Sequence, residues 1–387
     1  MDPIRALVHD LTAEVVAARR DLHRIPETGF EEKKTAAAVA ERLKQLGLAV
    51  KTGIAGTGVV GLLDTGRPGP TLMIRADMDA LPIAEETGLA FASTHPGCMH
   101  ACGHDAHMAI ALGAAAVLVR LSERIRGRVK FVFQPAEEGP GGAQPMIAAG
   151  VLADPPVDFA LACHLWSERP EGVIGVRSGA FLAAMDRFDI KIIGRGGHAA
   201  QPHLCVDALE VATQVVAALQ RIVSRQLDPL EPAVVTVGTF HAGTAFNITP
   251  AEAVLSGTTR TFNEAIWNSW PERLETVVSG VCAAMGAAYE FSFRRGYPPT
   301  VNDDTMAGVV RRAAEAVVGA ERVVVPERTM GGEDMSFFLK RVPGCFYCLG
   351  VGREGAAPLH NSKFDFNEEL MLLAVETHCR VALELLG

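Results

Sequence analysis

Side chains that bind metal ions are concentrated in the segment 99–107, MHACGHDAH, which holds three histidines and one cysteine. Cys102 and His104 are two residues apart, so a thiolate and an imidazole could bind the same ion. A lone cysteine would equally fit a small buried residue. The pair favours a metal site, whereas His100 and His107 are interpreted as neighbours of the site and not as ligands.

An apolar run, MAIALGAAAVLVRL at 108–121, follows this segment and predicts a helix. We expect Asp105 to be the N-cap of that helix, which places Cys102 and His104 in the loop that enters it. The positive end of a helix dipole lowers the pKa of a nearby thiol and favours the thiolate, the form that binds metals.

Four further segments place ligand-type side chains where a predicted strand ends or a loop begins. They are Asp77 and Asp79 in TLMIRADMDALP, Glu137 and Glu138 in FVFQPAEEG, His164 in LACHLW, and His360 in PLHNSKFDF. Singly, such residues often bond to a backbone carbonyl or lie on a solvated edge. Four chain segments that supply ligands on the side where sheets of this kind bind ligands indicate one shared site.

One thiolate, three imidazoles and one carboxylate suit Zn²⁺, Co²⁺ or Ni²⁺, and Mn²⁺ is also compatible. Five donors are more than one tetrahedral ion needs, so two ions that share a bridging ligand are predicted. Such a pair lowers the pKa of a bound water and polarises a carbonyl. A carboxylate that binds no ion could then accept the proton of the water, and Glu137 is the candidate.

These side chains must be positioned by a sheet, and the first half of the chain predicts one. The segments GVVGLLD, TLMIRAD, GRVKFVFQP and DFALACHLW are short, β-rich and bounded by turns, and an apolar helix lies among them. This alternation is typical of an α/β, doubly wound domain with a largely parallel sheet and helices on both faces. Ligands of such folds bind beyond the carboxyl ends of the strands.

From about residue 180 the pattern changes to four strand-like and two helix-like segments. Two helices on a four-stranded sheet form a compact α+β unit. We therefore expect an inserted domain at 180–293, with 1–179 and 294–387 together forming the catalytic, metal-binding domain.

Composition excludes several classes of protein. The chain has 387 residues, 49% hydrophobic and 21% charged, which predicts a globular protein of two domains. A net charge of -9 argues against nucleic acid or an anionic membrane as partner. The sequence has no recognisable signal peptide or membrane span, and its eight cysteines lack the spacing of a disulfide framework, so a cytoplasmic location is expected.

Eight motifs distributed over nearly the whole chain, in the same order, resemble those of the M20 metallopeptidase clan. They are RADMDALP, MHACGHDAHMA, FQPAEEG, GRGGHAAQPH, GTAFNITP, GTTRTF, MGGEDMSFF and PLHNSKFDF. The most similar branch contains hippurate hydrolase, the N-acyl-amino-acid aminoacylases and the plant auxin-conjugate hydrolases. The resemblance implies a catalytic domain with two divalent metal ions per subunit and an inserted lid domain that mediates homodimer formation.

The resemblance also implies roles for single residues. The implied metal ligands are Cys102, which bridges, with His104, Glu138, His164 and His360. Glu137 would be the general base that passes its proton to the leaving amine, and Asp79 would orient a ligand. Asp77 stands where other branches carry a ligand histidine, so it is left out of the metal set.

In the lid domain, the resemblance implies that His198 holds the substrate or its oxyanion, sometimes from the neighbouring subunit, and that Asn247 and Arg260 contact the substrate. Arg260 could clamp a free carboxylate with two parallel hydrogen bonds, although a strand-surface arginine would give the same pattern. Glu333 and Asp334 would support the ligands from behind. FNITP replaces the usual NVIP, a change that bears on acyl-group specificity.

The predicted function is metal-dependent hydrolysis of the amide bond of N-acyl amino acids, with an acetyl, benzoyl or similar acyl group. A dipeptidase or an N-carbamoyl-amino-acid hydrolase on the same scaffold is the alternative. A non-catalytic protein that binds an acylated metabolite is the third reading, and it would be expected to lack a ligand or the base.

Overall fold

The computed structural model describes residues 3–387, which divide into two compact units. The first unit contains the chain up to Gly179 together with Val301–Glu327 and Asp334–Gly387. The second unit is Ala180–Thr300 with Arg328–Glu333. The insert was expected to end at 293, but its last long strand continues past that residue, and the second unit extends to Thr300.

The first unit is built on an eight-stranded sheet with the order β1-β2-β4-β3-β5-β16-β6-β15. Its strands are β1 (Ala49–Ile54), β2 (Gly58–Asp64), β3 (Thr71–Asp77), β4 (Arg128–Gln134), β5 (Phe159–Pro170), β6 (Ile174–Gly175), β15 (Val323–Val324) and β16 (Gly344–Gly352). The four central strands β4, β3, β5 and β16 are parallel to one another. The edges are mixed, because β2 pairs antiparallel with β1 and β4, and β6 pairs antiparallel with β16.

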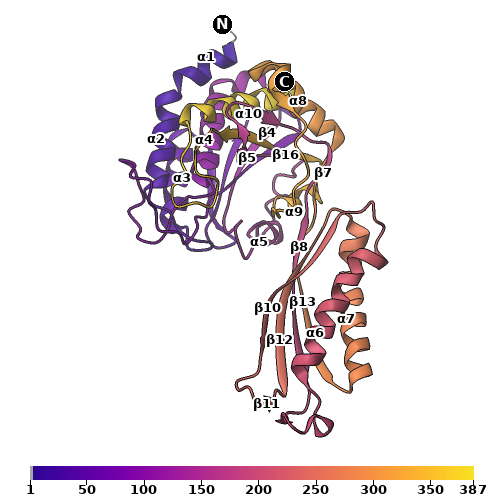
Figure 1. Ribbon diagram of the computed structural model, residues 1–387. Coiled ribbons are helices and arrows are strands. Elements are labelled where there is room, and N and C mark those ends of the chain that lie inside the picture. The colour runs from indigo at the N-terminus through magenta and orange to yellow at the C-terminus, as the bar shows by residue number, and fades with distance from the viewer. Residues whose placement is uncertain (1–2) are drawn as a thin grey trace. The chain divides into compact units, whose positions relative to one another are not determined.

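Helices cover both faces of this sheet, as the sequence predicted. Two glycines of β2 show the two layers, since residues an odd number of positions apart face opposite sides of a strand. A side chain at Gly61 would meet Leu43 of α3, and one at Gly58 would meet Met146 of α5. The helices of the unit, labelled in Figure 1, are α1 (Pro3–Asp10), α2 (Thr12–His23), α3 (Lys33–Gln45), α4 (His104–Arg120), α5 (Ala143–Ala148), α8 (Asp304–Val318), α9 (Ser336–Leu339) and α10 (Met371–Leu386).

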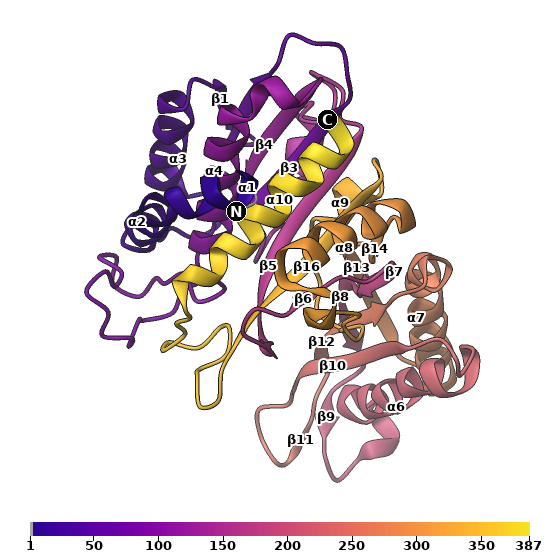
Figure 2. The ribbon, with the colours of Figure 1, turned by 90° about the horizontal axis from the view of Figure 1, so that it is seen from above.

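Helix α4 is the apolar helix predicted after the histidine-rich segment, and it lies in the core between α2, α10 and the sheet (Figure 2). Its N-cap is Gly103 and not Asp105. Gly103 has a left-handed φ of 81°, and a side chain there would meet Leu165 at 2.8 Å, so only glycine fits. Asp105 lies within the first turn, and its carboxylate points away from the helix start towards α2.

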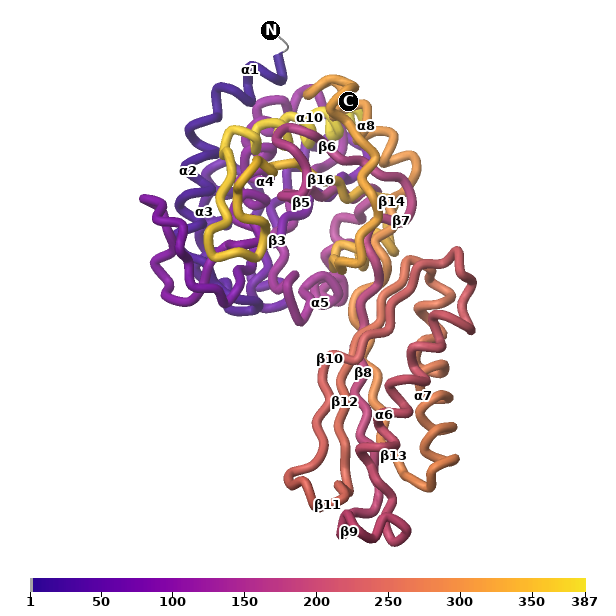
Figure 3. The backbone as a smooth tube through the Cα atoms, viewed as in Figure 1, coloured from indigo at the N-terminus to yellow at the C-terminus, as the bar shows by residue number. Residues whose placement is uncertain are grey.

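The second unit has its own sheet and its own core (Figure 3). Its four-stranded antiparallel sheet has the order β10-β12-β8-β13, and α6 and α7 pack against the same sheet and against each other. The elements are β8 (Ala184–Ile193), β9 (Gly197–His198), α6 (Ala208–Arg221), β10 (Ala233–Ala242), β11 (Ile248–Thr249), β12 (Glu252–Thr261), α7 (Glu264–Met285) and β13 (Ala288–Tyr297). The short strands β7 (Gly179–Leu182) and β14 (Thr300–Asn302) contain the unit boundaries.

Helix α7 begins at Glu264 and includes Pro271. A proline in a helix leaves the carbonyl four residues earlier without its N–H partner. That carbonyl belongs to Trp267, and it accepts a hydrogen bond from the Arg295 guanidinium of β13. Asn263 caps the helix through the N–H groups of Ala265 and Ile266. Among residues 3–387, no helix has both the length and the apolar character that crossing a membrane requires.

Helix α2 is fixed to the start of α4 by a buried charged cluster. The Asp105 carboxylate accepts hydrogen bonds from Arg19 Nε at 3.0 Å and from His23 Nδ1 at 2.8 Å, and Glu85 lies 3.2 Å from His23 Nε2. Burial alone would lower the pKa of His23, but the two carboxylates raise it to about 9.

Because the folded-state pKa of His23 lies above its unfolded value of 6.5, its stabilisation is complete below about pH 6.5 and is lost as the pH rises through 9. We expect this group to contribute about 3 kcal/mol of such loss. Urea unfolding of the chelator-treated protein between pH 6 and 9.5 measures it. His23→Gln should remove the His23 share of the pH dependence and leave that of His104, whereas the exposed His9→Gln should keep both. An unchanged slope in His23→Gln would contradict the assignment.

Candidate metal centre

The predicted ligands converge at the carboxyl end of the central parallel strands. Asp77 is the last residue of β3, and the turn that carries Glu138 follows β4. His164 was expected at the end of its strand, but β5 continues to Pro170. The pairing of β5 with β3 stops at Ala162, opposite Arg75, so His164 lies beyond the paired part of the two strands and level with Asp77 at the end of β3.

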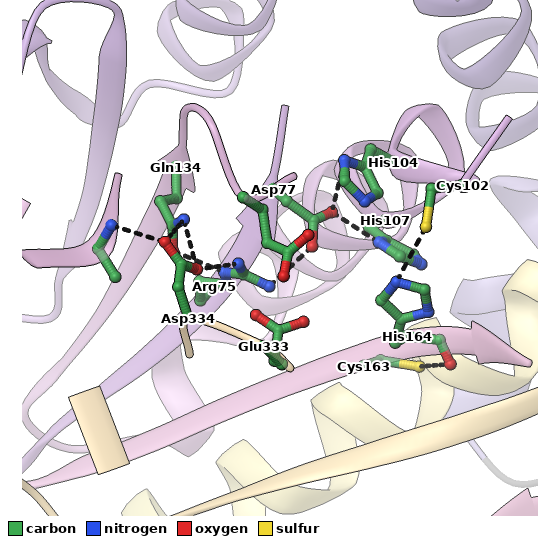
Figure 4. Close-up of polar contacts among 12 residues, drawn as sticks. Arg75, Asp77, Cys102, His104, His107, Gln134, Cys163, His164, Glu333 and Asp334 are labelled. Carbon is green, nitrogen blue, oxygen red and sulfur yellow. Dashed lines mark hydrogen bonds and ion pairs between the residues drawn. The ribbon is translucent and has the colours of Figure 1, made fainter. Parts of the chain in front are cut away.

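Five side chains from four chain segments meet there. Cys102 Sγ lies 3.5 Å from His164 Nε2 and 3.3 Å from His360 Nε2. His360 Nε2 lies 2.9 Å from Glu138 Oε1. One ligand atom each of Cys102, His104 and Glu138 lies within 4.8 Å of the others. The structure thus brings together all five residues predicted to bind metal, and Figure 4 shows three of them (Cys102, His104 and His164) around the start of α4.

The histidines present the nitrogen that a cation needs. His104 Nδ1 donates to the Asp79 carbonyl at 2.8 Å, and His164 Nδ1 donates to the Leu165 carbonyl at 2.6 Å. Each bond fixes the tautomer and leaves the lone pair of Nε2 for the site. His104 Nε2 is buried and has no hydrogen-bond partner among the residues that the structure describes. A buried acceptor in this state fits a bound metal ion.

His107 lies within the same group of side chains but has no free nitrogen. Its Nδ1 donates to Asp77 Oδ1 at 2.6 Å, and its Nε2 accepts the N–H of Leu165 at 2.9 Å. His107 therefore connects the end of β3 to the residue after His164, in agreement with its exclusion from the ligand set. Asp77 is likewise occupied by His107 and by Arg75.

The carboxylates give the site a negative potential. Burial alone would lower the pKa of His104, but Asp77, Asp79 and Glu138 raise it to about 10. Burial opposes ionisation of Glu138, yet its hydrogen bond with His360 lowers its pKa to about 2. A site that holds protons this firmly on imidazole attracts a divalent cation in their place.

We expected the pKa of the Cys102 thiol to be lowered, and for the protein chain without a bound cation this expectation was wrong. Burial raises the pKa of this thiol well above 9, and the Glu138 and Glu137 carboxylates raise it further. Cys102 precedes the helix start but is buried, and desolvation outweighs a helix dipole that acts only within the first turn. A cation bound to the sulfur reverses this balance, because a coordinated thiol loses its proton.

Glu137 and Glu138 lie on a turn that Asp79 fixes. The Glu137 N–H donates to Asp79 Oδ1 at 2.9 Å, and the Glu138 N–H donates to Asp79 Oδ2 at 3.0 Å. The Asp79 carbonyl also accepts from His104. Asp79 therefore holds one predicted ligand through its carbonyl and the two glutamates through its carboxylate. Glu137 itself is 6% exposed.

A fully buried arginine supports this end of the sheet (Figure 4). Arg75 donates to Gln134 Oε1 at 2.9 Å, to Asp77 Oδ2 at 2.7 Å and to Asp334 Oδ1 at 2.9 Å. Asp334 also accepts the N–H groups of Gly142 and Ala143. Burial raises the pKa of Asp334 to about 6 despite Arg75. Asp334 was expected to support the ligands, and it is connected to them through Arg75 and Asp77.

Arg75 was not predicted from the sequence, and neither was the connection that His107 makes between Asp77 and Leu165. A signal was available for Arg75, since an arginine inside the apolar strand TLMIRAD needs buried acceptors and Asp77 follows on the same face. No comparable signal existed for His107, because its partner Leu165 offers only a backbone N–H from a distant segment.

The three substrate residues predicted in the second unit do not lie together. His198 of β9 pairs with Ile248 of β11, and the Ala199 N–H donates to the Asn247 carbonyl, so His198 and Asn247 are neighbours and both are exposed. Arg260 is near the other end of β12, eight residues beyond Glu252. Eight residues of strand span roughly 26 Å.

Arg260 is half-buried, and its guanidinium donates to the carbonyls of Met330 at 3.2 Å and Thr259 at 2.8 Å. No carboxylate in the described part of the chain lies within ion-pair distance of it. Burial lowers the pKa of Arg260, but the group stays charged at neutral pH. It thus keeps a positive charge without an acidic partner.

A mainly parallel sheet that is covered by helices on both faces and carries a histidine, cysteine and carboxylate cluster at its strand ends is typical of a metal-dependent hydrolase. The chain belongs to peptidase family M20/M25/M40, whose family model matches residues 73–384. This agrees with the resemblance seen in the motifs.

Individual relatives cover most of the chain. The N-acyl-L-amino acid amidohydrolase of Geobacillus stearothermophilus is 48% identical over 304 residues, 78% of this chain and 82% of that protein. Thermostable carboxypeptidase 1 of Saccharolobus solfataricus is 38% identical over 97% of this chain and 96% of its own. The YXEP protein of Bacillus subtilis, a dinuclear metal binding peptidase from the M20 family, superposes with a TM-score of 0.84 at 33% identity, covering 98% of this chain and 99% of its own.

Replacing Asp79 should weaken metal binding without removing a ligand. In Asp79→Asn the side-chain NH₂ cannot accept an N–H, so either Glu137 or Glu138 loses its hydrogen bond. We expect the affinity for divalent ions to fall about 10- to 100-fold, measured by competition with a chromogenic chelator. The exposed Asp64→Asn is the matched control. Wild-type affinity in Asp79→Asn would show that the turn does not depend on Asp79.

Proposed function

We propose that this protein hydrolyses the amide bond of N-acyl amino acids to a carboxylate and a free amino acid, with Glu137 as general base. The observation that supports this most directly is the turn after β4. It carries a carboxylate within 2.9 Å of a ligand-type histidine, at Glu138, and a second buried carboxylate next to it, at Glu137. Hydrolysis assisted by metal ions needs both kinds of carboxylate.

In this proposal the five convergent side chains, Cys102, His104, Glu138, His164 and His360, would hold two divalent ions. When bound, the ions would polarise the substrate carbonyl and lower the pKa of an attacking water. A thiolate with imidazoles favours Zn²⁺, Co²⁺ or Ni²⁺ over harder ions, and Mn²⁺ remains compatible through the carboxylate. Asp79 and Leu165 keep the imidazoles in the tautomer that binds.

Glu137 would accept the proton of the attacking water and then give it to the amine nitrogen as the amide bond breaks. Its backbone N–H is fixed on Asp79, and in this proposal its carboxylate faces the substrate while that of the adjacent Glu138 faces the ions. Every position of the ligand set and of the base is filled, which disfavours a non-catalytic, metabolite-binding role.

Arg260 supports a substrate with a free carboxylate, because its charged guanidinium forms no ion pair among residues 3–387, and only the more distant Asp186 acts on it electrostatically. The name of the Geobacillus relative fits such a substrate. The Saccharolobus relative is named a carboxypeptidase, and that name favours cleavage of peptides as the second candidate function. An N-carbamoyl-amino-acid hydrolase would share the same site.

We further propose a homodimer formed through the second unit. His198 and Asn247 lie roughly 26 Å of strand away from Arg260, more than one N-acyl amino acid spans. The exposed apolar side chains near His198 include Phe246, fully exposed, and Ile248, 53% exposed. A second copy that covers these side chains would form the homodimer and place His198 at the interface between the two copies.

A cytoplasmic location is part of the same proposal. All eight cysteines are free, and six of them are buried in the core or at the metal centre. Free thiols in this number are typical of a reducing compartment.

Glu137→Gln tests the function most directly. The variant should bind two ions as the wild type does, but its kcat should fall about 10²- to 10⁴-fold because the proton acceptor is gone. The measurement is amine release from N-acetyl, N-benzoyl and N-carbamoyl amino acids and from dipeptides, with metal-stripped protein to which Zn²⁺, Mn²⁺, Co²⁺ or Ni²⁺ is returned. The exposed Glu86→Gln is the control.

Release from peptides alone would favour the carboxypeptidase-like function. Near-normal turnover in Glu137→Gln would remove Glu137 as the base, and no release with any metal despite two bound ions would reject hydrolysis of these amides.

Mixed dimers test whether His198 acts across the subunit boundary. His198→Ala and Glu137→Gln should each be inactive alone. After unfolding and refolding together, half of the dimers are hybrids with one complete site, so about a quarter of the wild-type activity should return. No recovery in a refolded mixture that is dimeric by light scattering would place His198 in its own subunit's site.

A further inference from the structure

The turn that carries the proposed base has a second anchor, which lies far away in the sequence. Glu32 is fully buried at the N-cap position of α3. Its Oε1 accepts the backbone N–H of Ala136 at 2.9 Å, and its Oε2 accepts the Thr57 hydroxyl at 2.6 Å. Neither contact belongs to the metal centre, and neither is needed to start α3, because the Glu32 side chain makes no capping bond there.

Ala136 has an unusual backbone conformation directly before Glu137. Its φ of 55° is in the left-handed region, which residues other than glycine rarely adopt. Its carbonyl accepts the N–H of Gly141 at 2.9 Å, so both polar groups of this residue are occupied. Gly29 lies directly against it, since a side chain at Gly29 would meet the Ala136 Cβ at 2.9 Å.

Three successive N–H groups of the turn are therefore held by two carboxylates. Asp79 accepts those of Glu137 and Glu138, and Glu32 accepts that of Ala136. Asp79 fixes the backbone nitrogens of Glu137 and Glu138. The conformation of Ala136 fixes the direction of the chain at the start of Glu137. A strained conformation persists only where its surroundings specify it.

We propose that Glu32 is a positioning residue for amide hydrolysis: it holds Ala136 in the left-handed conformation and thereby aims Glu137, without touching substrate or metal. This inference rests on the proposed function of Glu137. Its content is a hydrogen bond and not a charge, because the effect reaches Glu137 through the backbone. Any acceptor of the same shape at residue 32 should therefore suffice.

Two substitutions of similar size separate the hydrogen bond from the charge. In Glu32→Gln the amide oxygen can accept the Ala136 N–H, and the amide NH₂ can donate to the Thr57 hydroxyl. In Glu32→Met both bonds are lost. Thr57→Val removes only the contact on the far oxygen, and Glu31→Gln changes the exposed neighbouring carboxylate.

The experiment measures kcat, KM and bound metal for each variant, together with hydrogen exchange of the peptide that contains Ala136. We expect Glu32→Gln, Thr57→Val and Glu31→Gln to keep kcat within about threefold of the wild type. Glu32→Met should lose about 100-fold in kcat, with KM and two bound ions unchanged, because a displacement of about 1 Å at the base costs this much. Exchange at Ala136 should rise in Glu32→Met only.

Equal losses in Glu32→Gln and Glu32→Met would overturn the proposal in favour of a charge effect. Unchanged exchange in Glu32→Met, or a lower melting temperature with unchanged kcat per folded molecule, would overturn it in favour of a purely structural role. Glu137→Gln, assayed in parallel, separates the two hypotheses. If it keeps its turnover while exchange rises in Glu32→Met, then Glu32 holds the turn and the assignment of Glu137 as base is what fails.

Discussion

The burial of the Arg75 guanidinium is the constraint on which the metal centre depends. A charge that is 2% exposed must be matched by acceptors, and here they are two carboxylates and one amide oxygen from three chain segments. Gln134 is the last residue of β4, and Asp334 belongs to a segment that the chain reaches only after the second unit. Because one buried cation must be neutralised, Gln134, Asp77 and Asp334 are held together next to the predicted ligands.

Hydrogen bonds connect Arg75 to the predicted ligands through Asp77 and His107. Asp77 accepts from both Arg75 and His107. Burial would raise the pKa of Asp77, but His104, Arg75 and the hydrogen bond from His107 hold it well below its usual range. His107 in turn orients the strand that carries His164. The carboxylates of this cluster attract a divalent ion. Metal binding and local order are therefore expected to be linked.

Much of this arrangement could be predicted from the sequence, for a physical reason. Ligands such as His104 and Glu138 follow strands or begin a helix, and parallel strands place such positions at one edge of the sheet. The contacts of backbone groups could not be predicted, because an N–H carries no sequence signature. Glu32 is one of two adjacent glutamates in FEEKK, and nothing distinguishes its partner Ala136 from any other alanine until its φ is known.

The limits of the local patterns follow from the same cause. Asp105 resembled an N-cap, but Arg19 and His23 of another helix bind its carboxylate, and the start of the helix was left to Gly103. The separation of Arg260 from His198 needed the register of β12, which no motif encodes. In both cases contacts with residues distant in the sequence determined the structure, and the local sequence pattern did not.

The insertion of the second unit into the first has a consequence for how the protein is made. The strand of His164 pairs with Cys348 of β16, and Cys102 meets His360 across 258 residues of chain. A ribosome releases the whole second unit, with its self-contained core, before it releases these partners. The inserted unit can fold early, whereas the sheet of the first unit cannot be completed until β16 has been synthesised. The nascent chain therefore lacks part of the predicted set of metal ligands until synthesis is almost finished.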